Sequence, residues 1–113
     1  MKKLLLSVFI LSVLAACSTV ELAEPNQTDV VWAQKKFPSI TLSDLNEGKV
    51  LFEKNCGLCH SLKRSMRQDE AELPKIVTEM SEKVNKKRKS EVMGKEEQQL
   101  LLQYLVTLNG VPQ

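Results

Sequence analysis

The chain contains few of the residues that build most metal sites and catalytic sites. It has one histidine, three cysteines and an aromatic content of 4% over 113 residues. A structural zinc site requires four ligands, but the sequence holds a single Cys-x-x-Cys pair and no histidine beyond His60. No set of acid, base and nucleophile stands out elsewhere. The composition therefore argues against a zinc protein and against an enzyme that acts on a small-molecule substrate.

Length and charge narrow the class of protein further. The 113 residues provide for one domain, and the formal net charge is +2. Without Lys2 and Lys3 at its extreme N-terminus, the chain would be close to neutral. Nucleic-acid binding needs a basic surface, and we expect no nucleic-acid partner.

The first residues have the form of a secretory signal. Lys2 and Lys3 precede a short apolar run over residues 4–13, which is too short to cross a membrane as a helix. The run ends in Leu14-Ala15-Ala16-Cys17, which resembles the lipobox of bacterial lipoproteins over those four residues. The resemblance implies that residues 1–16 are a signal peptide.

The same resemblance implies that Cys17 carries a diacylglyceryl thioether, which anchors the protein in a bacterial membrane facing the periplasm. Ser18 follows the cysteine where an aspartate would retain a lipoprotein in the inner membrane, so the outer membrane is favoured. The alternative is an ordinary cleavage site with a chance cysteine. That alternative leaves an odd free thiol in an exported protein, whereas lipid attachment accounts for it.

The most informative stretch is Cys56-Gly57-Leu58-Cys59-His60. Its C-x-x-C-H pattern is that of covalent c-type haem attachment, in which each thiolate adds across one haem vinyl group. His60 directly follows the second anchor and can bind the iron as proximal ligand. Half of a zinc site and a thioredoxin-like dithiol are the alternatives. The first lacks ligands, and the second needs a βαβ context that the surrounding sequence does not show.

The small number of large side chains also points to a prosthetic group. After signal cleavage the aromatic residues are Trp32, Phe37, Phe52 and Tyr104. A domain of this size has a small hydrophobic core and usually needs an additional stabilising element, such as a disulfide or a bound metal. One covalently bound haem c would supply the missing apolar surface.

The periodicity predicts an all-α fold with three main helices, over about 41–55, 69–84 and 95–108. Residues 17–38 are expected to form a tether, flexible to about Gln27, and an N-terminal arm packed on the domain. Residues 39–113 form the haem domain. We expect a solvated loop over residues 86–89, which are all basic, and a helix stop at Asn109-Gly110.

The first of these helices carries specific local signals. Thr41 and Ser43 are candidate N-caps, and Asp44 stands three residues after Thr41, as in a capping box. Gly48 lies on the apolar face with Phe52, where a glycine costs helix stability. An interior glycine on that face predicts that another helix crosses there at close range.

From about Leu42 to Leu108 the chain resembles the small class I cytochromes c with one haem. The match consists of the helix with Gly48 and Phe52, the motif at residues 56–60, and a last helix with Leu101 and Tyr104. In that family the first and last helices cross near the glycine, and aromatic residues from both pack at the crossing. The resemblance implies a cytochrome c-like fold and a one-electron carrier.

The family usually provides a methionine as sixth iron ligand, and a second histidine is excluded here because His60 is the only one. Met80 lies in a segment similar to the ligand-bearing segment of short bacterial cytochromes, although Leu73-Pro74 stands where a tryptophan is usual. Met93 is the second choice, and Met66 is too close to His60. A chain without a methionine ligand remains the third possibility.

These expectations describe a membrane-anchored electron-transfer protein with redox protein partners. Two rival functions remain at this stage. One is a haem sensor or ligand-binding protein with five-coordinate iron. The other is an accessory subunit whose haem holds a larger oxidoreductase together.

Overall fold

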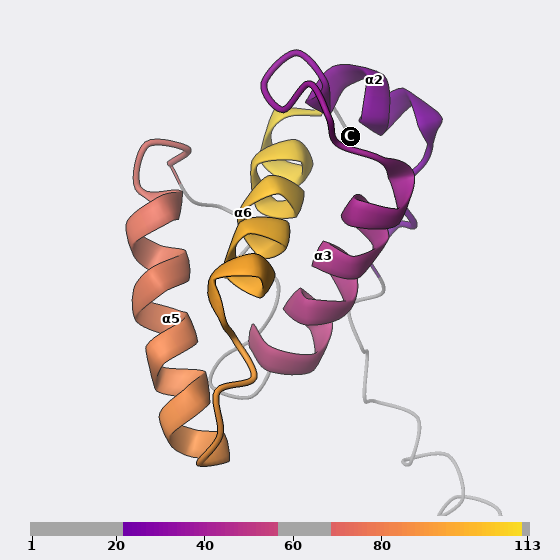
Figure 1. Ribbon diagram of the computed structural model, residues 1–113. Helices are drawn as coiled ribbons and strands as arrows, with labels where there is room; N and C mark the ends of the chain where they lie inside the picture. Colours follow the sequence, from indigo (N-terminus) through magenta and orange to yellow (C-terminus); the bar gives the residue numbers. More distant parts are fainter. Residues whose placement is uncertain (1–21, 57–68, 112–113) are drawn as a thin grey trace, which may run out of the picture.

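The computed structural model describes residues 22–56 and 69–111, and the described part is all helical. Four helices follow one another: α2 (Gln27–Ala33), α3 (Leu42–Asn55), α5 (Leu73–Arg88) and α6 (Lys95–Gly110). Helix α6 lies between α3 on one side and α5 on the other (Figure 1). Helix α2 covers the N-terminal end of α3 and the C-terminal end of α6. The expected all-α class is confirmed for these residues, which contain no strand.

Helix α3 begins at the predicted cap. The Thr41 hydroxyl accepts a hydrogen bond from the Asp44 backbone N–H at 3.2 Å. The Asp44 carboxylate accepts one from the Thr41 backbone N–H at 2.8 Å. This reciprocal pair is a capping box, and it satisfies two N–H groups that the first turn leaves without helical partners. Of the two candidate N-caps, Thr41 is therefore the one used.

We expect Thr41→Ala to lower the free energy of unfolding by about 1 kcal/mol, because the first turn loses its cap. Urea denaturation of the purified protein measures this change. Ser43→Ala is the matched control, since the Ser43 hydroxyl only donates to Glu47 at 3.4 Å on an exposed face. An equal loss in both variants would show that the cap has no special role.

Helices α3 and α6 cross at Gly48, as the glycine predicted. A Cβ atom at Gly48 would lie 2.5 Å from both the Leu100 carbonyl oxygen and the Tyr104 Cβ. Next to this crossing, the rings of Phe52 and Tyr104 pack with centroids 5.9 Å apart at 49°. Two aromatic rings at this separation add to the stability that their burial provides. The close approach therefore requires a residue without a side chain at position 48.

The N-terminal arm packs on the domain, as expected. Its helix α2 begins at a capping box formed by Asn26 and Asp29, and it buries Val30 and Ala33. Trp32 of this helix lies against the last residue of α6, where a Cβ atom at Gly110 would fall 2.0 Å from the indole Cη2. Gly110 is thus required by packing, and it is also the last residue of α6, which ends at the expected stop Asn109-Gly110.

Helix α5 differs most from its prediction. It begins at Leu73 rather than Asp69, with Pro74 in its first turn as expected, and it ends at Arg88 rather than Val84. The residues expected to form a solvated loop therefore continue the helix as far as Arg88, and Lys89 caps it with φ 54°. Positive side chains are favoured in the last turn of a helix because the carbonyl end of the helix dipole is negative.

Two groups of buried side chains form the core. The smaller group joins the arm to the start of α3: Val30, Ala33, Ile40 and Leu45. The larger group lies where α3, α5 and α6 meet and includes one residue before α2: Leu22, Phe52, Leu73, Val77, Val84, Met93, Leu101, Tyr104, Leu105 and Val106. The residues around Leu22 were expected to be a flexible tether, whereas Leu22 is 6% exposed and packs in this core group.

Candidate functional site

Of the motif residues 56–60, Cys56 lies within the described part of the chain. It follows α3 directly as the C-cap, with φ −74° and ψ −29°, so the backbone enters the motif in helical conformation. Its side chain is half-buried and packs against the larger core group. Cys59, His60 and Met66, as well as Cys17, lie outside the described residues.

Met93 is one of the most deeply buried side chains of the described structure, with 1% of its surface exposed. Asn85 holds its backbone, accepting from the Met93 N–H at 2.8 Å and donating to the Met93 carbonyl at 3.1 Å. The Asn55 side chain lies 3.5 Å from the Met93 sulfur and donates to it. These contacts place Met93 in the core beside Asn55, the last residue of α3. The motif begins at the next residue, Cys56.

Met80 has a different setting on α5. The buried stripe of this helix consists of Leu73, Val77, Ser81 and Val84. Met80 is only half-buried, as is Ile76 one turn before it. The two residues are one helical turn apart and lie beside the buried stripe, so Met80 is less enclosed by the core than Met93.

Helices α3 and α5 both pack on α6, and they share no comparable packing with each other within the described residues. A hydrogen bond links their C-terminal ends, because the Arg88 guanidinium donates to the Lys54 carbonyl oxygen at 3.1 Å. Cys56 at the end of α3 and Met80 on α5 therefore belong to two helices that both pack on α6.

A buried hydroxyl on α5 has no hydrogen-bond partner among the described residues. It belongs to Ser81, which is 1% exposed and stands directly after Met80. A buried polar group without a partner costs about 1–3 kcal/mol. Because of this cost, we expect a polar atom outside the described residues to form a hydrogen bond with the Ser81 hydroxyl.

A charged cluster lies on α3 that the sequence did not reveal. Lys49 is 7% exposed, and its ammonium group contacts Glu24 at 2.6 Å and Glu53 at 3.0 Å. These two carboxylates hold the pKa of Lys49 above its ordinary value, with hydrogen bonding to Glu24 the larger cause. Glu24 stands 25 residues before Lys49, so no local spacing could have indicated this pair.

Tyr104 lies close to this cluster and is buried at the crossing of α3 and α6. Its hydroxyl also has no partner among the described residues. Burial raises the pKa of the hydroxyl to about 12 from its ordinary value of 10.0. The folded protein therefore keeps Tyr104 protonated at a pH at which the unfolded chain would release the proton.

We expect stability to fall between about pH 10 and pH 12, since the unfolded state binds fewer protons in that range. Tyr104 contributes on the order of 2 kcal/mol to this fall. The measurement is the free energy of unfolding against pH for the wild-type protein and for Tyr104→Phe, which keeps the ring. The variant should lose less stability at high pH, and parallel curves would contradict this assignment.

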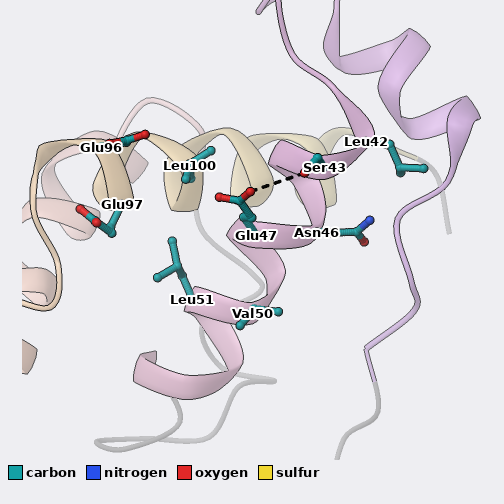
Figure 2. Close-up of a pocket in the computed structure, with 9 residues that line it drawn as sticks. All are labelled: Leu42, Ser43, Asn46, Glu47, Val50, Leu51, Glu96, Glu97 and Leu100. Carbon is teal, nitrogen blue, oxygen red and sulfur yellow. Dashed lines mark hydrogen bonds between the residues drawn. The ribbon is translucent and has the colours of Figure 1, made fainter.

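A groove of about 680 Å³ runs between α3 and the start of α6 (Figure 2). Leu51 and Leu100 point into it from opposite helices, Val50 adds apolar surface, and glutamates stand at its rim. Its described lining is Leu42, Ser43, Asn46, Glu47, Val50, Leu51, Glu96, Glu97 and Leu100. Cys56, Met80 and Met93 are not among these residues, so none of the described candidate haem-binding residues lines the groove.

The described residues contain neither a cluster of metal-binding side chains nor a membrane-spanning helix. Over 22–56 and 69–111, no three His, Cys, Asp or Glu side chains gather in a metal-binding group. None of the helices in these ranges has the length and apolar character needed to cross a membrane. No family model, curated protein or solved structure matches the chain.

Proposed function

We propose that this protein is a membrane-anchored, one-electron carrier with one covalent haem c. The observation that carries the proposal is the motif Cys56-Gly57-Leu58-Cys59-His60 directly after a helix that crosses the last helix at Gly48. The Phe52–Tyr104 ring pair beside the crossing adds support, because the resemblance to class I cytochromes c implies this arrangement.

The described residues fit a haem in three respects. The Cys56 side chain lies at the edge of an apolar core, where a porphyrin could pack. Helices α3 and α5 pack on α6 and not extensively on each other. Ser81 provides a buried hydroxyl without a described partner, close in sequence to Met80. Each feature supports the proposal, because a haem would need an apolar setting with a few polar contacts.

Each predicted residue has a distinct role in the proposal. Cys56 and Cys59 would hold the macrocycle through thioether bonds, and His60 would provide one protein ligand to the iron. Met80 would provide the second, a soft thioether that favours the ferrous state and raises the potential. When bound, the haem supplies an iron that cycles between ferrous and ferric states. The chain carries out no bond chemistry on a substrate, and its partners are redox proteins of the periplasm.

The decisive experiment is a denaturing gel stained for haem together with a reduced-minus-oxidised spectrum of the purified protein. A stained band that survives denaturation and a reversible spectral change are expected. A protein that is expressed with the cytochrome c maturation machinery and remains unstained would overturn the proposal.

Met80→Ala is expected to abolish the sulfur-to-iron charge-transfer band of the oxidised protein and to open the iron to carbon monoxide when reduced. Met93→Ala is the control, since it should keep the band and lose about 2–5 kcal/mol of stability through the cavity it leaves. A band that survives Met80→Ala assigns the ligand elsewhere. Ready carbon monoxide binding by the wild-type protein would instead favour a five-coordinate sensor.

A stoichiometric partner that co-purifies with the protein would favour the accessory-subunit function. Gel filtration of the detergent-solubilised protein distinguishes this case, because a free carrier elutes without a fixed partner. An electron carrier must meet its donor and its acceptor in turn, so its complexes with both are expected to be transient.

A further inference from the structure

We propose that residues 22–26, the N-terminal strap, hold the helical domain close to the membrane in one orientation, with α5 directed away from the lipid surface. The inference rests on the lipid attachment at Cys17 in the proposed function. It does not depend on the haem. The partner it identifies is a lipid surface, and the strap is the part of the chain that sets the orientation.

The strap is part of the folded domain. Leu22 is 6% exposed and belongs to the same core group as Phe52 and Tyr104. Glu24, two residues later, contacts the buried ammonium group of Lys49 at 2.6 Å. An apolar anchor and a charged contact on neighbouring residues hold the strap on α3, whereas a flexible tether would make neither.

The docked strap leaves a short link to the lipid. Four residues, 18–21, separate Cys17 from Leu22. Even a fully extended chain spans at most about 18 Å over this separation. A tether that stayed flexible to Gln27 would have ten residues, 18–27, instead of four and would let the domain turn freely. The short link therefore restricts how far the domain can move and which side can face the lipid.

The position of the strap selects the side that lies nearest the membrane. Its residues form one wall of a cavity of about 350 Å³, and the other wall includes Leu45 of α3, Tyr104 in the C-terminal half of α6, and Val111, the C-cap of α6. Helix α5 lies on the far side of α6 from α3 (Figure 1). Docking the strap at the membrane thus leaves α5, with its basic last turn, on the outer side.

Energy transfer from a dye on the protein to acceptor-labelled lipid headgroups tests this orientation. The full-length lipidated protein is reconstituted into phosphatidylethanolamine–phosphatidylglycerol vesicles, with the dye on a single introduced cysteine. Val111→Cys places it at the strap cavity, and Lys75→Cys places it on α5, where the side chain is 80% exposed. We expect higher transfer from position 111 than from position 75.

Two variants should remove the difference between the dye positions. Leu22→Asp with Glu24→Gln releases the strap, because it puts a charge in the core and removes the carboxylate that contacts Lys49. A Gly/Ser insertion of about ten residues between Ser18 and Thr19 leaves the docked strap intact but adds ~17 Å of flexible reach. The insertion keeps the test valid if the first variant fails to fold.

Equal transfer from the two positions in the wild-type protein would overturn the inference, as would a difference that survives the insertion. A protein that does not float with the vesicles at all would overturn the lipid attachment, and the inference with it. A protein that floats and shows the expected difference but binds no haem would support the strap and contradict the electron carrier.

Discussion

Replacing Cys56 and Cys59 together with serine is expected to abolish covalent haem attachment. A serine hydroxyl is close to a thiol in size, but it does not add to a vinyl group as a thiolate does. The larger core group, against which Cys56 packs, would then lack the apolar surface that a porphyrin provides. We expect complete loss of the haem-stained band on a denaturing gel and a large fall in the amount of folded protein.

The third cysteine provides a matched control for this prediction. Cys17→Ser should keep the haem stain and lose membrane association, because the lipid and the haem use different sulfur atoms in the proposal. Extraction with acidified organic solvent separates covalent from non-covalent haem in each variant. If the double variant keeps a stain that resists this extraction, attachment through Cys56 and Cys59 is wrong.

Gly48→Val is expected to have the second-largest effect, a loss of about 3 kcal/mol or more in the free energy of unfolding. The first carbon of the new side chain would lie 2.5 Å from the Leu100 carbonyl oxygen and the Tyr104 Cβ. Neither neighbour is the end of a flexible side chain, so α3 and α6 must separate. That movement would also disturb the Phe52–Tyr104 pair. Urea unfolding of the purified holoprotein measures the loss.

Gly94→Ala is the control, because it adds a carbon to a glycine that no helix crosses. A Cβ there would meet the carboxylate end of the Glu97 side chain, which can turn away. We expect a change of only a few tenths of a kcal/mol up to about 1 kcal/mol, typical of a helix N-cap position. If Gly48→Val unfolds at the same urea concentration as Gly94→Ala, the crossing does not depend on the glycine.

The sequence predicted best those features whose cause lies within a few residues. Thr41 and Asp44 are three residues apart, and their capping box forms as expected. The start of α6 at Lys95 and the place of Pro74 in the first turn of α5 were also predicted. Gly48 is a special case, since a helix interior disfavours glycine and the residue therefore indicated a long-range contact.

Local signals were less reliable at helix ends. The basic run at residues 86–89 was expected to form a loop from its charge alone, but Lys86, Lys87 and Arg88 continue α5. Asn109-Gly110 was expected to stop α6, and α6 does end at Gly110, but the Trp32 indole also lies against this glycine. A glycine near a helix end can serve as a stop or as a packing site, and the sequence cannot distinguish these uses without the partner.

Of the candidate site, the sequence supplied every residue type that the proposal uses, from the spacing of Cys56, Cys59 and His60 to the choice between Met80 and Met93. Two of the motif's three haem-binding residues, Cys59 and His60, lie outside the described residues, so the haem site stays a prediction. The tertiary structure added the contrast between the two methionines. Met93 is held by Asn55 and Asn85 in the core, and Met80 lies half-buried on α5.

By itself, therefore, the sequence determined the helical class, the α3 cap, the helix crossing at Gly48 and the motif that predicts the haem. Only the tertiary structure decided that Leu22 is buried, that Lys49 is paired with Glu24, and that Met93 belongs to the core. The physical reason is distance along the chain. Capping and helix periodicity act over three or four residues, whereas Glu24 and Lys49 are 25 residues apart and Asn55 and Met93 are 38 apart.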